Sequence, residues 1–140
     1  MATEDRTEIE KLQGQSAFMR LLGLNFEEAG PDRVVASFEA NEDHHQPWGI
    51  VHGGVLPAVI ETAATTGAYL AVKDEGRLAA GVNNVTDFLR PHEQDKLRVV
   101  AEPLQKGKSQ QLWQVIVERE EDGKTVARGQ VRLQNIERGA

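Results

Sequence analysis

The sequence predicts a single α+β domain, spanning residues 1–140, in which an antiparallel sheet wraps around one long central helix. Three observations lead to this prediction. Residues 55–72 are apolar or small almost all round, so a helix there has to be buried. Segments with strand character follow that stretch one after another, and turn residues separate them. The chain of 140 residues is long enough for one domain with its own core.

The part of the chain before the central helix is expected to add short helices and one strand. Residues 7–22 carry apolar side chains at helical spacing and predict one or two helices, which Gly23 can end. Residues 1–12 are expected to form a loosely held N-terminal segment. Residues 33–40 alternate between apolar and polar side chains, which predicts a strand with one face toward water. Residues 41–49 are rich in turn formers and predict a loop.

Local sequence signals also predict where the central helix and the strands after it begin and end. The stretch 55–72 has no Lys, Arg or Asp, and Pro57 is tolerated because the first turn of a helix needs no N–H partner. The helix is expected to end near residues 73–76. An Asp-Gly pair at 122–123 predicts a hairpin turn. Four antiparallel strands are expected over residues 80–90, 97–104, 110–120 and 125–136.

Composition excludes several classes of function. The chain has no cysteine, which removes disulfides, thiolate metal sites and thiol catalysis. Its net charge of −6 argues against nucleic-acid binding, because phosphate binding requires a basic field. No run of 18 apolar residues is present and the acidic N-terminus does not resemble a signal peptide. We therefore expect no nucleic-acid or membrane partner, and a cytoplasmic location.

The central helix carries one acidic residue, Glu61, within an otherwise apolar stretch. Burying a carboxylate in such a helix is costly unless the group is paired or used chemically. Thr65 follows one turn later on the same face. Before the helix, Gly53 and Gly54 allow the backbone to approach a ligand closely, and the first N–H groups of the helix have no partner inside it. Such donors suit a carbonyl oxygen that gains negative charge.

Gly53 and Glu61 are too far apart to act together within one chain. Eight residues of helix separate them by about 12 Å, and the glutamate side chain recovers only part of this gap. If Gly53 polarises a carbonyl group that Glu61 attacks, the two residues must come from different subunits. The sequence therefore predicts an obligate dimer with two equivalent sites at its interface.

The motif QPWGIVHGG at residues 46–54, followed by Glu61 and Thr65, resembles the hotdog-fold acyl-CoA thioesterases. The order of elements, DFLRP at residues 87–91 and GKS at residues 107–109 extend the resemblance over nearly the whole chain. It is greatest to the branch that includes 4-hydroxybenzoyl-CoA thioesterase, where the helix acid is glutamate. The phenylacetate-pathway thioesterases are similar but usually have aspartate there. The resemblance implies a hotdog fold and hydrolysis of an acyl-CoA, here expected to be an aryl-CoA such as 4-hydroxybenzoyl-CoA.

The same resemblance implies a role for each matching residue. The Gly53 N–H would polarise the thioester carbonyl, and Glu61 would attack it or activate a water molecule that does. Gln46 would orient the thioester or the water, Thr65 would hold the water, and His52 would brace the loop. Residues expected to bind substrate or CoA are Arg90, Lys108, Ser109, Arg138, Thr62 and Trp48. No cofactor is implied, because CoA is part of the substrate, and two dimers are expected to form a homotetramer.

Two other functions stay open on the sequence alone. Acyl-thioester dehydratases and hydratases share the fold and pair a loop histidine with a helix acid, and His44, His45 and His52 are candidate partners for Glu61. The other alternative is a non-catalytic acyl-CoA binding module. The glycine pair directly after His52 favours the thioesterase. No metal is expected, because the adjacent His44 and His45 point apart and no HExxH spacing is present.

Overall fold

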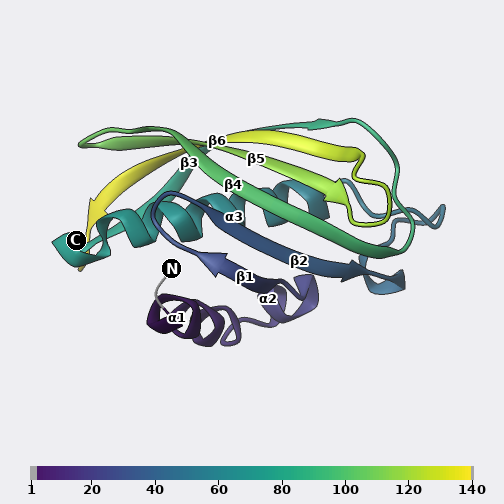
Figure 1. The fold of residues 1–140 in the computed structure, drawn as a ribbon, viewed down its shortest axis with the longest axis horizontal. Helices are drawn as coiled ribbons and strands as arrows, with labels where there is room; N and C mark the ends of the chain where they lie inside the picture. Colours follow the sequence, from purple (N-terminus) through teal and green to yellow (C-terminus); the bar gives the residue numbers. More distant parts are fainter. Residues whose placement is uncertain (1–2, 140) are drawn as a thin grey trace.

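The computed structural model describes residues 3–139 and shows a six-stranded antiparallel sheet that curves around one long helix, α3 (Figure 1). The predicted hotdog architecture is confirmed. The elements in chain order are α1 (Thr3–Gln13), α2 (Ala17–Leu22), β1 (Asn25–Ala29), β2 (Val34–Ala40), the short 3-10 helix η1 (Glu42–His44), α3 (Val55–Val72), the 3-10 helix η2 (Lys73–Glu75), β3 (Arg77–Phe88), β4 (Asp95–Lys106), β5 (Gln110–Arg119) and β6 (Thr125–Glu137).

The order of strands across the sheet is β1-β2-β4-β5-β6-β3, so β1 and β3 form the two edges. β3 follows α3 in the chain but pairs with the last strand, β6. Three apolar side chains of β3, Val82, Val85 and Phe88, are more than half exposed. An exposed apolar edge strand is a template for pairing with another chain.

A buried tryptophan fixes the position of α3 against the sheet. Trp113 of β5 is fully buried, and its ring packs so tightly on Gly67 that an added Cβ at Gly67 would lie 2.3 Å from it. The Trp113 Nε1–H donates to Gln111 Oε1 (2.9 Å), and Gln111 Nε2 donates to the carbonyl of Ala68 (3.0 Å). This contact accounts for the glycine in the middle of the helix, because no larger residue would admit the ring.

The two N-terminal helices lie beside α3 and the edge strand β1 (Figure 1). Gly23 ends α2 in the left-handed conformation, with φ of 69°, which confirms its predicted position as a stop. Of the segment 1–12, which the sequence predicts to be loosely held, Met1 and Ala2 lie outside the described residues. The remainder forms most of α1, whose Ile9 is only 2% exposed and belongs to the hydrophobic core.

Two details of the sequence prediction are wrong. β1 was not expected, because its five residues, NFEEA, are too short and too acidic for a clear alternating pattern. The face of β2 that was predicted to be wet is exposed only at Glu39, since Val35 and Ser37 are each only 3% exposed. β2 is paired on both sides, by β1 and β4, and its small side chains are covered by longer cross-strand neighbours such as Arg98 opposite Ser37.

We predict that Gly67→Ala destabilises the protein by about 2 kcal/mol, because the new methyl group would overlap the Trp113 ring. On an unobstructed helix, a change from glycine to alanine would instead stabilise the protein by about 1 kcal/mol. Urea unfolding of wild type and variant measures the difference in their free energies of unfolding. Gly30→Ala is a matched control, because an added Cβ there would lie 3.7 Å from its nearest neighbour. A Gly67→Ala protein as stable as the wild type would contradict this packing.

Candidate active site

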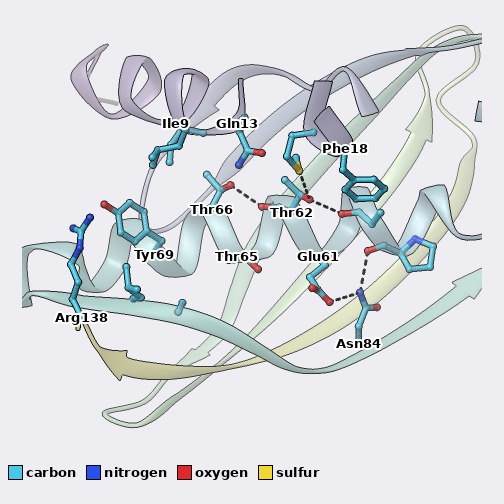
Figure 2. A pocket seen from close by; sticks show the side chains of 16 residues that line it. Ile9, Gln13, Phe18, Glu61, Thr62, Thr65, Thr66, Tyr69, Asn84 and Arg138 are labelled. Atoms are coloured by element: carbon cyan, nitrogen blue, oxygen red, sulfur yellow. Dashed lines mark hydrogen bonds between the residues drawn. The ribbon is translucent and has the colours of Figure 1, made fainter. Parts of the chain in front are cut away.

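A cavity of about 850 Å³ lies between α3, the two N-terminal helices and the edge strand β3 (Figure 2). Its size is within the range of small-molecule binding sites. Apolar side chains from α1 and α2 form much of one wall, and the polar groups are concentrated on α3. The polar residues that α3 contributes are Glu61, Thr62, Thr65, Thr66 and Tyr69.

Glu61 is exposed, which corrects the expectation that the central helix hides it. The sheet covers only one side of α3, where Val59, Ile60 and Ala63 are fully buried. Glu61 lies at the margin of this covered side, next to the edge strand β3, and projects into the cavity (Figure 2). A helix that is apolar almost all round can therefore still have one side that its own chain does not cover.

Residues of β3 that the sequence analysis did not single out surround Glu61. Asn84 Nδ2 donates to Glu61 Oε1 (3.4 Å) and to the carbonyl of Pro57 (3.1 Å), and Thr86 Oγ1 donates to Asn84 Oδ1 (2.8 Å). An added Cβ at Gly81 would lie 3.4 Å from the Glu61 carboxyl carbon, so this glycine leaves room beside the carboxylate. No local pattern indicates these residues, because only the packing of α3 on β3 brings them to Glu61.

The threonines of α3 differ in what their hydroxyl groups can offer. Thr62 Oγ1 donates to the carbonyl of Ala58 (2.7 Å), and Thr66 Oγ1 donates to the carbonyl of Thr62 (2.7 Å). Thr65 lines the same cavity as Glu61, and within residues 3–139 its hydroxyl has no hydrogen-bond partner. Of the three, Thr65 therefore has the hydroxyl that a bound molecule can use in both directions.

Gly53 lies outside this cavity and lines a second one of about 330 Å³, together with Gln46, Phe88 and Arg90. The backbone N–H groups on either side of Gly53 all donate to protein acceptors, at 2.7–3.0 Å; they belong to Val51, His52, Gly54 and Val55. In the described part of the chain, the Gly53 N–H is the one amide of this run without an acceptor. An unpaired N–H beside a cavity is the donor that a developing oxyanion requires.

His52 and Gln46 fix the shape of the loop before α3. His52 Nδ1 accepts the Gly54 N–H (2.7 Å), and the ring is so close that a Cβ at Gly54 would lie 3.1 Å from this nitrogen. Gln46 Oε1 accepts the Trp48 N–H, which leaves both Nε2–H donors of Gln46 available to a ligand. Trp48 is 84% exposed and lines neither cavity.

None of the three loop histidines lines the cavity of Glu61. His44 Nε2 lies 2.7 Å from the carbonyl of Leu21, and His45 Nε2 lies 2.6 Å from the carbonyl of Glu93. The histidine–acid pair that a dehydratase needs is therefore not formed within one chain. Within residues 3–139, no three His, Asp or Glu side chains are grouped so that they could hold a metal ion.

The residues expected to contact the CoA phosphates lie at opposite ends of β3. Arg90 follows its last residue and donates to a backbone carbonyl at the start of β6 (2.8 Å). At the other end, Arg77 donates to the carbonyl of Lys108 (3.0 Å), next to Ser109, and the Arg138 N–H donates to the carbonyl just before β3 (3.1 Å). A strand of this length spans about 40 Å. A single chain therefore does not bring Arg90 together with the other three.

An ionic cluster between α1 and α3 closes the end of the large cavity that is distant from Glu61. Tyr69 OH donates to Glu8 Oε1 (2.8 Å), and Lys73 Nζ donates to Glu8 Oε2 (2.9 Å) and Asp5 Oδ1 (2.7 Å). The hydrogen bonds from Lys73 and Tyr69 hold the pKa of Glu8 below its ordinary value. Burial, together with the bond to Glu8, raises the pKa of Tyr69. This cluster fixes α1 as the roof of the cavity.

A family model described as the thioesterase superfamily matches residues 49–126. The chain belongs to the thioesterase superfamily. The matched region contains Gly53, Glu61, Thr65 and Asn84, and so it includes parts of both cavities.

Known members of the thioesterase superfamily are similar over most of the chain. The Mycobacterium tuberculosis protein Rv1847, named as an esterase, is 46% identical over 118 residues, which are 83% of this chain and 84% of the relative. Its solved structure has a TM-score of 0.84 and covers 89% of this chain. The proofreading thioesterase EntH of Cronobacter turicensis is 30% identical over 96 residues, which are 69% of each chain. A solved Haemophilus influenzae thioesterase is 27% identical, with a TM-score of 0.84, and the match covers 94% of this chain and 92% of that one. As a member of this superfamily with thioesterase relatives, the protein is a thioester hydrolase.

We predict that Glu8→Gln loosens the roof of the cavity and lowers the free energy of unfolding at pH 7 by about 1 kcal/mol. Because the folded pKa of Glu8 lies below its unfolded value, this stabilisation is complete above the unfolded pKa and is lost as the pH falls through the folded pKa. Urea unfolding of wild type and variant should therefore differ at pH 7, and the difference should shrink as the pH falls below the unfolded pKa of about 4.3. A difference that does not shrink as the pH falls would show that the charge of Glu8 is not responsible.

Proposed function

We propose that the protein hydrolyses acyl-CoA thioesters, and in particular an aryl-CoA such as 4-hydroxybenzoyl-CoA, to the free acid and CoA. One observation carries this proposal. In this thioester hydrolase, the backbone N–H of Gly53 is unpaired and lies just before α3. The carboxylate of Glu61 is exposed and lies about two turns along the helix. These are the two groups that attack on a thioester carbonyl requires.

The reaction needs few other groups. The Gly53 N–H binds the carbonyl oxygen, and Glu61 attacks the carbonyl carbon, so that the C–S bond breaks, CoA leaves as a thiolate and water opens the resulting mixed anhydride. Alternatively, Glu61 takes a proton from a water molecule held by Thr65, and this water attacks. A thiol with a pKa of about 8.5 leaves without a strong general acid. No metal or cofactor enters either route.

The walls next to Glu61 favour a flat acyl group with a polar substituent. Ala58, Thr62 and Thr65 form a row of small residues along α3 that lines the cavity. Such a row leaves room for an aromatic ring, and threonine hydroxyl groups can bond a hydroxyl on it. We therefore propose an aryl-CoA ahead of phenylacetyl or medium-chain esters.

We further propose that two subunits together form each site. Within one chain, Gly53 and Glu61 line different cavities. Gly53 lies beside the Phe88 ring and Glu61 beside Gly81, and both of these neighbours belong to the edge strand β3. Antiparallel pairing of two β3 strands about an axis near Val85 would place Phe88 next to Gly81 of the partner subunit. Gly53 of each subunit would then face Glu61 of the partner subunit.

The same pairing accounts for the separated CoA-binding candidates. Because the strands run in opposite directions, the Arg90 end of one β3 would approach the Arg77 end of the other. Lys108, Ser109 and Arg138 lie at that second end. One CoA could then contact Arg90 of one subunit and the three others from the partner subunit. The exposed apolar residues of β3 would be buried in this interface.

We predict that Glu61→Gln lowers kcat by 10²- to 10⁴-fold on every CoA ester, because the amide can act neither as nucleophile nor as base. Thiol release is measured with benzoyl-, 4-hydroxybenzoyl-, phenylacetyl-, short-chain and long-chain CoA, and 4-hydroxybenzoyl-CoA should react fastest. Full activity of Glu61→Gln would contradict the proposed mechanism. Hydration of an enoyl-CoA without thiol release would instead identify a hydratase.

We predict that two inactive variants restore activity when they share a dimer. Gln46→Ala and Glu61→Gln alter opposite halves of the proposed site. In a mixed dimer one site carries both changes and the other carries neither, so about half of the wild-type activity should return. The variants are co-expressed with different tags and purified through both. A mixed dimer that stays inactive would place the whole site within one chain.

A further inference from the structure

We propose that Asn84 is a positioning residue for Glu61. Its side-chain amide holds one carboxylate oxygen and leaves the other directed toward the substrate, and Thr86 keeps the amide in the orientation that does so. This inference rests on the proposed function, because Asn84 has this task only if Glu61 is the reacting group. Figure 2 shows Asn84 reaching from β3 toward α3, with dashed lines to Glu61 and to a backbone oxygen.

Asn84 contacts both the side chain and the helical turn that carries it. Its Nδ2 donates to Glu61 Oε1 (3.4 Å) and to the carbonyl of Pro57 (3.1 Å), which lies one turn before Glu61. One amide group therefore ties the start of α3 and the carboxylate to the same point on β3. The 3.4 Å contact is at the long end of hydrogen bonds, as is common for catalytic groups without substrate.

The orientation of the Asn84 amide is determined by its neighbours. The Pro57 carbonyl can only accept a hydrogen bond, so the atom that faces it must be the nitrogen. On the opposite side, the Thr86 hydroxyl donates to Oδ1 at 2.8 Å. A flipped amide would place Asn84 Oδ1 against both the Pro57 carbonyl oxygen and Glu61 Oε1. These three oxygens are all acceptors, and none of them would then have a donor.

A neutral tether suits an exposed attacking group. Ordering a glutamate side chain costs conformational entropy, and a group that is free to rotate is seldom in position to react. A lysine or arginine would order Glu61 by pairing with its charge, but within residues 3–139 Glu61 forms no ion pair. The amide restrains Oε1 alone and leaves Oε2 its lone pairs. Gly81 adds no side chain that would cover it.

The test compares Asn84→Ala in two backgrounds. In the wild-type background, we expect kcat to fall 10- to 100-fold, with KM changed by less than about 3-fold. In the Glu61→Gln background, the same change should have no further effect, because Asn84 acts through Glu61. Urea unfolding of each variant separates this loss from a loss of folded protein.

Two further variants test the chemistry of the contact. Asn84→Asp keeps the shape but places a second carboxylate beside Glu61, so like-charge repulsion should shift the acid limb of the pH–rate profile upward by about one unit. Thr86→Val removes the hydroxyl that orients the amide and should lower kcat about 3- to 10-fold, whereas Thr86→Ser should keep the wild-type rate. The two Thr86 changes reach the carboxylate only through Asn84, so they remain informative if Asn84→Ala fails to fold.

The outcomes distinguish this inference from the function on which it rests. If Glu61→Gln keeps full activity, the proposed function fails and the inference fails with it. If Glu61→Gln is inactive while the Asn84 variants keep the wild-type kcat and pH profile, only the inference is overturned. An Asn84→Ala effect of equal size in both backgrounds would also overturn it, because Asn84 would then act independently of Glu61.

Discussion

The packing of Trp113 on Gly67 is the contact on which the rest of the structure depends. It fixes how far α3 lies from the sheet and which side of the helix faces it. Glu61 lies outside this buried side, next to the edge strand β3, and is thereby directed into the cavity. The functional face of the helix is thus a consequence of how its buried face is packed.

The curved sheet covers only one side of α3, and the other side is incomplete in a single chain. The cavity of Glu61 and the cavity of Gly53 are separate, and the apolar edge of β3 is exposed between the residues that adjoin them. These features have one common explanation in the proposed pairing of two β3 strands. In such a dimer the exposed edge would be buried and the groups needed for one reaction would meet.

Two carboxylates show how the surroundings of a side chain determine its role: Glu61, which lines the large cavity, and Glu8 of α1, which is bonded to the lining residue Tyr69. Glu8 is bonded to a lysine and a tyrosine, and this pairing lowers its pKa and makes it an anchor for α1. Glu61 has only the neutral amide of Asn84 as a side-chain partner in the described structure. A carboxylate whose charge is already paired is a poor nucleophile or base, whereas one that is merely held in place remains reactive.

The sequence by itself determined the central helix over the apolar stretch 55–72, which ends just before the predicted end near residues 73–76, because such a stretch and its flanking glycines are local signals. It also determined the strands that follow and the spacing of Gly53 and Glu61. Only the tertiary structure decided that Glu61 is exposed and that Asn84, 23 positions later, holds it. That contact depends on the register of β3 against α3, and a register set by packing between distant segments leaves no mark in local patterns.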